Sequence, residues 1–228
     1  KMAGNPETVD QFLASLMEPA IAKAKVEIAD MQVEMDKDIK AGVVPAGSKI
    51  EPWDWAYYTE KVRKAKYALD EEQTKPYFKM ENVRQGVFDL TTKLWGLKYE
   101  KLEDIPTYHA DVEGFKVMDA DGSLIGVILT DYFPRSTKRG GAWMTNFVNQ
   151  EKIDGKDIRP VIVNVGNFAK PVDGKPSLLT LDQVETLFHE YGHALHGLLS
   201  KCTYKSVAGT SVARDFVELP SQIMENWA

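Results

Sequence analysis

Five residues of this sequence, His189-Glu190-Tyr191-Gly192-His193, constrain its fold more than any other feature. They lie in a segment with helical signals, since Thr180 and Gln183 fit a capping box and apolar residues recur at helical spacing. In a helix, residues four apart project from nearly the same face, so both imidazoles can bind one zinc ion. Glu190 lies about 100° around the helix, from where it can reach a water molecule. The motif therefore predicts a helix that supplies two zinc ligands and a base.

A third zinc ligand is expected downstream, because a catalytic site of this type combines two histidines with a carboxylate and keeps one position for water. Glu218 is the predicted ligand, 25 residues after His193, in a segment over 213–227 that is predicted to be the final helix. Three polar residues would share its helix face and are candidates to orient the imidazoles. They are Asp215, Gln222 and Glu225.

Two other residues near the motif offer alternatives. His196 lies three residues after His193. We expect it to pack in the core or to contact a residue that binds zinc, rather than to bind zinc itself. Cys202 is the only cysteine, and it is predicted to lie in a loop. A structural zinc ion would need four protein ligands, usually with cysteine, which this region fits poorly. A non-catalytic zinc-binding module that joins two helices is thus the weaker hypothesis.

The remaining sequence predicts helices first and strands later. Apolar residues at helical spacing predict helices over the first forty residues, from about residue 52, and over about 80–94. Two runs, 113–118 and 123–130, are joined by a turn sequence and predict a β-hairpin, and 159–168 predicts a further strand.

We therefore expect a mainly α fold with a small β-sheet, an α+β class. No internal repeat or long polar linker divides the chain, so a single domain over 1–228 is predicted. Its parts would be a helical part over 1–100, a small sheet over 110–168 and the zinc-binding helices over 180–228.

The charge and hydropathy of the chain limit the classes of partner and the cell compartment that we expect. The chain has 28 basic and 34 acidic residues, a net charge of −6, which argues against nucleic acid or an anionic membrane surface as a partner. No segment approaches the ~20 apolar residues of a membrane span. The single cysteine excludes an internal disulfide, so a cytoplasmic location is expected, or a periplasmic one if a targeting segment is missing.

Beyond the motif itself, the sequence resembles the thimet-oligopeptidase family of zinc peptidases, and within it the bacterial peptidyl-dipeptidases. The strongest similarity covers 189–197, 209–222 and Glu225-Asn226-Trp227. Further similar segments lie upstream, at 139–144, 160–168, 176–180 and the helix that begins at Asn5-Pro6. The resemblance thus spans nearly the whole chain.

The resemblance implies a zincin-like metallopeptidase catalytic domain, with a deep channel that admits short unstructured peptides. His189, His193 and Glu218 match the family's ligands to one Zn²⁺ ion, and Glu190 matches its catalytic glutamate. The strand over 161–168 matches the edge strand along which substrate lies. The expected reaction is peptide hydrolysis by zinc-activated water, with release of C-terminal dipeptides. The alternatives are an oligopeptidase that cuts internally and an inactive zinc-binding fragment.

Chains of the family are longer at both ends, so residues 1–228 are expected to be a partial catalytic domain. Its partners would be short peptides and the missing N- and C-terminal parts of the same enzyme. The tyrosine and histidine that stabilise the oxyanion in the family have no counterpart here. If the chain carried its own oxyanion donor, Tyr132 and Tyr204 would be the first tyrosines to consider.

Overall fold

The computed structural model describes residues 2–68 and 71–228 and contains two compact units, Lys1–Gln73 and Thr74–Ala228. Helices occur in both units and strands in the second, so the predicted α+β class is confirmed for the described residues. The grouping of residues 1–228 into one partial catalytic domain stays a prediction. No helix in the described part of the chain is long and apolar enough to cross a membrane.

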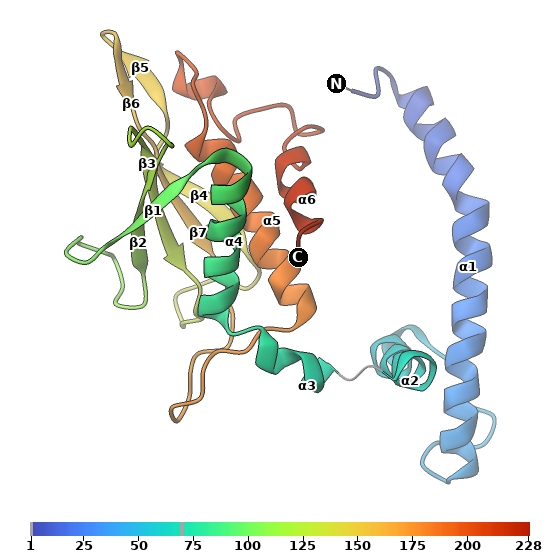
Figure 1. The fold of residues 1–228 in the computed structure, drawn as a ribbon. Coiled ribbons are helices and arrows are strands. Elements are labelled where there is room, and N and C mark those ends of the chain that lie inside the picture. The colour runs from blue at the N-terminus through green and yellow to red at the C-terminus, as the bar shows by residue number, and fades with distance from the viewer. Residues whose placement is uncertain (1, 69–70) are drawn as a thin grey trace. The chain divides into compact units, whose positions relative to one another are not determined.

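The first unit is built from two helices, α1 (Pro6–Lys40) and α2 (Trp55–Tyr67) (Figure 1). Asn5 starts α1, because its side-chain oxygen accepts a hydrogen bond of 2.8 Å from the Thr8 amide. A small core of Met31, Met35 and Tyr58 joins the two helices.

Shorter helical turns of the described residues lie at Pro52–Asp54, α3 (Glu71–Thr74), Lys75–Tyr77 and Lys205–Val207.

The second unit contains a five-stranded sheet in the order β1-β2-β3-β7-β4. All neighbours are antiparallel except β3 and β7, which run parallel. A separate two-stranded sheet is formed by β5 and β6. The strands are β1 (Lys98–Leu102), β2 (Glu113–Met118), β3 (Leu124–Asp131), β4 (Trp143–Val148), β5 (Glu151–Ile153), β6 (Lys156–Ile158) and β7 (Val161–Val165).

This sheet confirms the predicted hairpin, β2–β3, and corrects two other expectations. The sheet begins at Lys98, inside the part predicted to be helical over 1–100 and before the predicted sheet range of 110–168. The strand predicted at 159–168 is β7, which covers only Val161–Val165 and lies inside the sheet rather than at its edge. Both sides of β7 are paired, because β4 adds to it opposite β3. The edge strand on this side of the sheet is therefore β4.

Three helices complete this unit: α4 (Met80–Trp95), α5 (Leu181–Leu198) and α6 (Leu219–Glu225). The main core joins α4 and α5 to one face of the sheet, which we call the helix face, through residues such as Val87, Tyr191 and Ile162 (Figure 1). The opposite face, which we call the outer face, carries a smaller cluster of Val112, Leu129, Val163 and Val165. Burial of these apolar side chains provides the main favourable term in folding.

The last helix differs from the sequence prediction of 213–227, because α6 begins only at Leu219. Pro220 lacks a backbone N–H and its ring would clash with a preceding helical turn, which favours it in the first turn of a helix, where α6 has it. Residues 214–218 form turns instead. The prediction that Asp215 shares a helix face with Glu218 is therefore wrong, because both residues lie before α6.

Candidate metal centre

The three predicted ligands converge at one place in the second unit. His189 and His193 lie one turn apart on α5, and Glu218 directly precedes α6. The Oε2 atom of Glu218 lies 3.3 Å from Nε2 of His189 and 3.0 Å from Nε2 of His193. These side chains each present a potential ligand atom within 4.8 Å of the others. No other such cluster of three was found among the described residues.

The meeting of α5 and α6 depends on Gly192, inside the histidine motif. A Cβ atom at this position would lie 2.5 Å from the carbonyl oxygen of Pro220 and 2.6 Å from Cα of Ser221. Both contacts are to backbone, which cannot rotate away as a side chain can. The absence of a side chain at Gly192 therefore lets α6 approach closely enough to bring Glu218 to the imidazoles.

The orientation of His189 is held by Glu225. Its Oε1 atom lies 2.6 Å from Nδ1 of His189, which leaves Nε2 directed at Glu218. Of the three predicted orienting residues, Glu225 forms a hydrogen bond with an imidazole of the cluster. Gln222 is exposed, and Asp215 lies in the turns before α6.

Glu218 makes a further contact that the sequence did not predict, with Ser221. The buried Ser221 hydroxyl donates a hydrogen bond of 2.7 Å to Oε2 of Glu218. This bond, aided by the nearby His193, keeps the pKa of Glu218 below its usual value despite some burial. Serine three residues after a ligand on a short helix is a common pattern, so the sequence offers no distinctive signal for this contact.

Glu190 lies at the same pocket but in a different environment. Burial raises the pKa of its carboxyl to about 7, a shift that His189 opposes and Glu218 adds to. Its Oε2 atom is buried without a hydrogen-bond partner in the described structure. Asn164 of β7 fixes the backbone below it by donating a hydrogen bond of 2.8 Å to the Glu190 carbonyl. A carboxyl with a near-neutral pKa suits a general base.

The pocket that contains these groups has a volume of about 410 Å³. The start of β4, at Ala142, Trp143 and Met144, forms one wall, opposite the two histidines and Glu218. The strand expected beside the site, 161–168, is thus one position further into the sheet, and β4 takes its place. The free edge of β4 is the edge available to an extended peptide.

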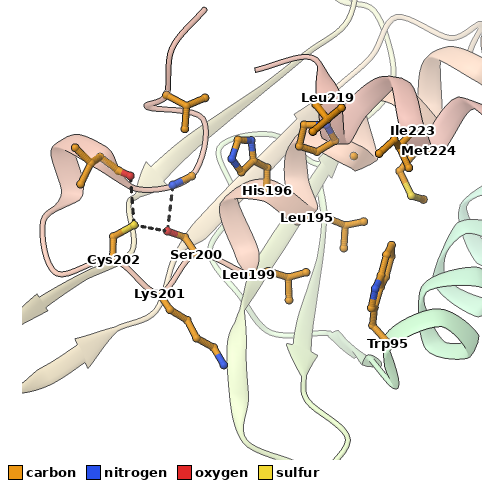
Figure 2. Close-up of a pocket in the computed structure, with 15 residues that line it drawn as sticks. Trp95, Leu195, His196, Leu199, Ser200, Lys201, Cys202, Leu219, Ile223 and Met224 are labelled. Carbon is orange, nitrogen blue, oxygen red and sulfur yellow. Dashed lines mark hydrogen bonds between the residues drawn. The ribbon is translucent and has the colours of Figure 1, made fainter. Parts of the chain in front are cut away.

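A larger hollow, of about 500 Å³, is lined by another part of α5 together with α6 and does not contain the three converging residues. Figure 2 shows its apolar wall of Leu195, Leu199, Leu219, Ile223 and Met224, with Trp95 from α4. His196 lies here, 6.1 Å from the Phe216 ring, and is not part of the metal cluster. This placement supports packing as its role.

Cys202 and the two alternative tyrosines also lie outside the metal cluster. Cys202 lies in the larger hollow, where its Sγ is 3.3 Å from the Val207 carbonyl oxygen (Figure 2). Tyr132 is buried in the main core against Phe168, and Tyr204 is exposed. Neither tyrosine lines the metal pocket.

Comparison with known proteins shows which proteins the chain is similar to. The model of the family described as peptidase family M3 matches residues 1–228. The chain is 44% identical over 229 residues to dipeptidyl carboxypeptidase of Salmonella typhimurium and of Escherichia coli, and 40% identical to oligopeptidase A of Escherichia coli. Each alignment covers 100% of this chain but only 32% or 33% of the relative. The chain thus spans about a third of the length of the curated relatives it matches.

Proposed function

The chain belongs to peptidase family M3, and we propose that it is the metal-binding part of a zincin-like zinc peptidase that hydrolyses short peptides. The observation that carries the proposal is the convergence of His189, His193 and Glu218 at the pocket that also contains Glu190. Two imidazoles and a carboxylate, with room for water, form the donor set of a catalytic zinc site.

The state of each donor supports binding of one Zn²⁺ ion. Burial lowers the pKa of His193, which favours the neutral imidazole that a metal requires. Glu225 occupies Nδ1 of His189 and leaves its Nε2 for the metal. A carboxylate that accepts a hydrogen bond from Ser221 stays ionised as a ligand must. The residues present therefore fit zinc.

The reaction follows from the groups around this site. Zinc, when bound, lowers the pKa of a water molecule to about 7 and polarises a carbonyl group. Glu190 accepts a proton from the attacking water and passes it to the leaving amine. The free edge of β4 aligns an extended peptide by backbone hydrogen bonds, as in strand addition.

For the cleavage pattern, we favour release of C-terminal dipeptides, because two of the similar relatives are named dipeptidyl carboxypeptidases. Internal cleavage is the second candidate, since oligopeptidase A is nearly as similar. A non-catalytic zinc module is less well supported, because only three protein ligands converge and a buried carboxyl, Glu190, lies beside them. We also propose a cytoplasmic location, with the periplasm as the alternative.

We propose that the part of the enzyme outside residues 1–228 covers a surface of this chain and supplies the oxyanion donor. The apolar hollow lined by α5 and α6 (Figure 2) would be covered by it, which would bury Leu219 and Ile223, now 50% and 45% exposed. The oxyanion donor would come from the same part. Because loss of one such donor costs ~10²–10³-fold in rate, residues 1–228 alone should turn over peptides very slowly.

The test is product analysis with the full-length protein. One short peptide is supplied with a free C terminus and with an amidated C terminus, and bound zinc is measured in the same preparation. Dipeptide from the free form alone would support the favoured pattern, and internal products from both forms would support the second candidate. Stoichiometric zinc without any product would overturn the peptidase proposal.

A further inference from the structure

The edge strand β4 presents its side chains to both faces of the sheet, as strand geometry requires. Met144 packs against the main core on the helix face, whereas Trp143 packs against the cluster on the outer face. Thr145 and Phe147 follow Trp143 at alternate positions and line a separate hollow of about 250 Å³. A peptide added to β4 would likewise direct alternate side chains to the metal pocket and to this hollow, which we call the outer hollow.

The charge of the outer hollow is set by one buried carboxylate and three cations. Asp131 accepts two hydrogen bonds of 2.8 Å from Arg135, one of 2.9 Å from Tyr108 and one of 2.9 Å from Lys138. Lys138 also donates to the carbonyl oxygens of Asp131 and Phe133, so its donors are used within the loop. The carboxylate is therefore fully engaged, and the hollow retains positive charge.

Arg139 is the cation of this hollow that has no carboxylate partner among the described residues. Its guanidinium lies 5.6 Å from the centre of the Trp143 ring, beside the first residue of β4. Asn167 fixes the backbone from Arg139 to Gly141 by donating hydrogen bonds of 2.8 Å and 2.7 Å to the carbonyl oxygens of these two residues. An arginine placed in this way is ready to pair with an anion.

The other walls of the outer hollow are aromatic. Phe147 is 63% exposed and meets Tyr108 edge to face, with ring centres 5.8 Å apart. Aromatic surface beside an unpaired guanidinium suits a side chain with an apolar stem and a carboxylate end. The free backbone edge of β4 lies next to this wall, so a peptide can occupy both at once.

We propose that the outer hollow is a subsite that binds a carboxylate of the peptide through Arg139. This inference rests on the proposed function, since it takes a peptide aligned on β4 as the occupant. The carboxylate can belong to a glutamate or aspartate side chain near the cleaved bond, or to the C terminus of the peptide. Both sources offer the same charge-assisted hydrogen bonds to the guanidinium.

The experiment measures peptide affinity in the full-length, zinc-loaded protein carrying Glu190→Gln, so that no peptide is consumed. Variants of one fluorescent peptide are compared in two pairs. The members of one pair have glutamate or glutamine beside the cleaved bond, and those of the other pair have a free or an amidated C terminus. Arg139→Gln should weaken binding of the carboxylate-bearing form by about three- to tenfold and leave its neutral counterpart unchanged. The pair of peptides that responds identifies the source of the carboxylate.

Two further variants are controls. Arg139→Lys keeps the charge and should retain part of the preference, whereas Lys156→Gln removes a charge from β6, outside the hollow, and should change neither affinity. Equal affinity of Arg139→Gln and its parent for every peptide, or an equal loss for all of them, would overturn the subsite. Absence of hydrolysis by the enzyme without Glu190→Gln would overturn the peptidase function instead, and the affinity comparison would still decide the subsite.

Discussion

Gly192 of α5 lies so close to Pro220 of α6 that a Cβ atom there would sit 2.5 Å from the proline carbonyl oxygen. This contact fixes the distance between the helix that carries both histidines and the residue before α6, Glu218. The close approach of two helices thus determines the size of the metal site.

The first prediction concerns the contact itself. Gly192→Ala should separate α5 from α6, lower zinc affinity by about tenfold or more and destabilise the fold by ~1–3 kcal/mol, as overpacking does. Gly86→Ala on α4 is the matched control, since a Cβ atom there meets nothing within 4 Å. It should stabilise the protein by about 0.5–1 kcal/mol. Equal behaviour of the two variants in urea unfolding and zinc titration would contradict this view of Gly192.

The second prediction identifies the ligands. His189→Ala and His193→Ala should each abolish stoichiometric zinc, and Glu218→Ala should weaken binding strongly, because each removes one of three protein ligands. His196→Ala should retain the metal, since His196 lies in the other hollow. Bound zinc is measured by elemental analysis after dialysis. Unchanged affinity in Glu218→Ala would show that Glu218 is not a zinc ligand.

The third prediction separates base from ligand. In the full-length protein, Glu190→Gln should keep zinc and lose about 10²–10⁴-fold in turnover, the range for removal of a general base. Glutamine keeps the size of the side chain but cannot accept the proton. Zinc content and hydrolysis are measured on the same preparation. Loss of metal from this variant would mean that Glu190 is a ligand or a structural residue.

The fourth prediction concerns support of His189. Glu225→Ala removes the partner of Nδ1 and should weaken zinc binding by about 10–100-fold, as loss of such outer contacts does. Gln222→Ala changes an exposed residue of the same helix and should have little effect. Zinc titration against a chelator compares the two. A similar loss in both variants would point to general damage of α6 rather than to the orientation of His189.

The fifth prediction uses pH and tests the outer face. Burial opposes ionisation of Asp131, but hydrogen bonds from Arg135, Lys138 and Tyr108 outweigh it and lower the pKa to about 2. The pKa in the folded state is thus below the value of 3.8 that is usual for an aspartate. The stabilisation is therefore fully present above about pH 4 and is lost as the pH falls towards 2.

Asp131→Asn should accordingly destabilise the protein at pH 7 by about 3 kcal/mol or more, because Lys138 would remain buried without its anion. The difference between variant and parent should shrink between about pH 4 and pH 2. Urea unfolding at a series of pH values measures it, with the exposed Asp104→Asn as control. A difference that stayed constant down to pH 2 would show that the ionised carboxylate contributes nothing.

Much of the fold and of the site could be predicted from local pattern. The capping box at Thr180 and the spacing of His189 and His193 depend only on residues within one or two turns, so α5 was predictable with its two histidines. The β2–β3 hairpin was predictable for the same reason, since its strands are joined by a short turn. Glu218 was selected as the carboxylate of the segment that follows the histidine helix, and the family resemblance agreed with it; the structure brings it within 3.0 Å of His193.

What the sequence by itself determined about this protein is therefore the α+β class, the histidine helix and the family. Only the tertiary structure decided that β4 rather than 161–168 forms the edge strand, that Glu225 rather than Gln222 holds His189, and that Arg139 faces a separate hollow. The physical reason is distance along the chain. Strand order and interhelical contacts are set by packing between residues that are far apart in sequence, such as Gly192 and Pro220, and no local period records that packing.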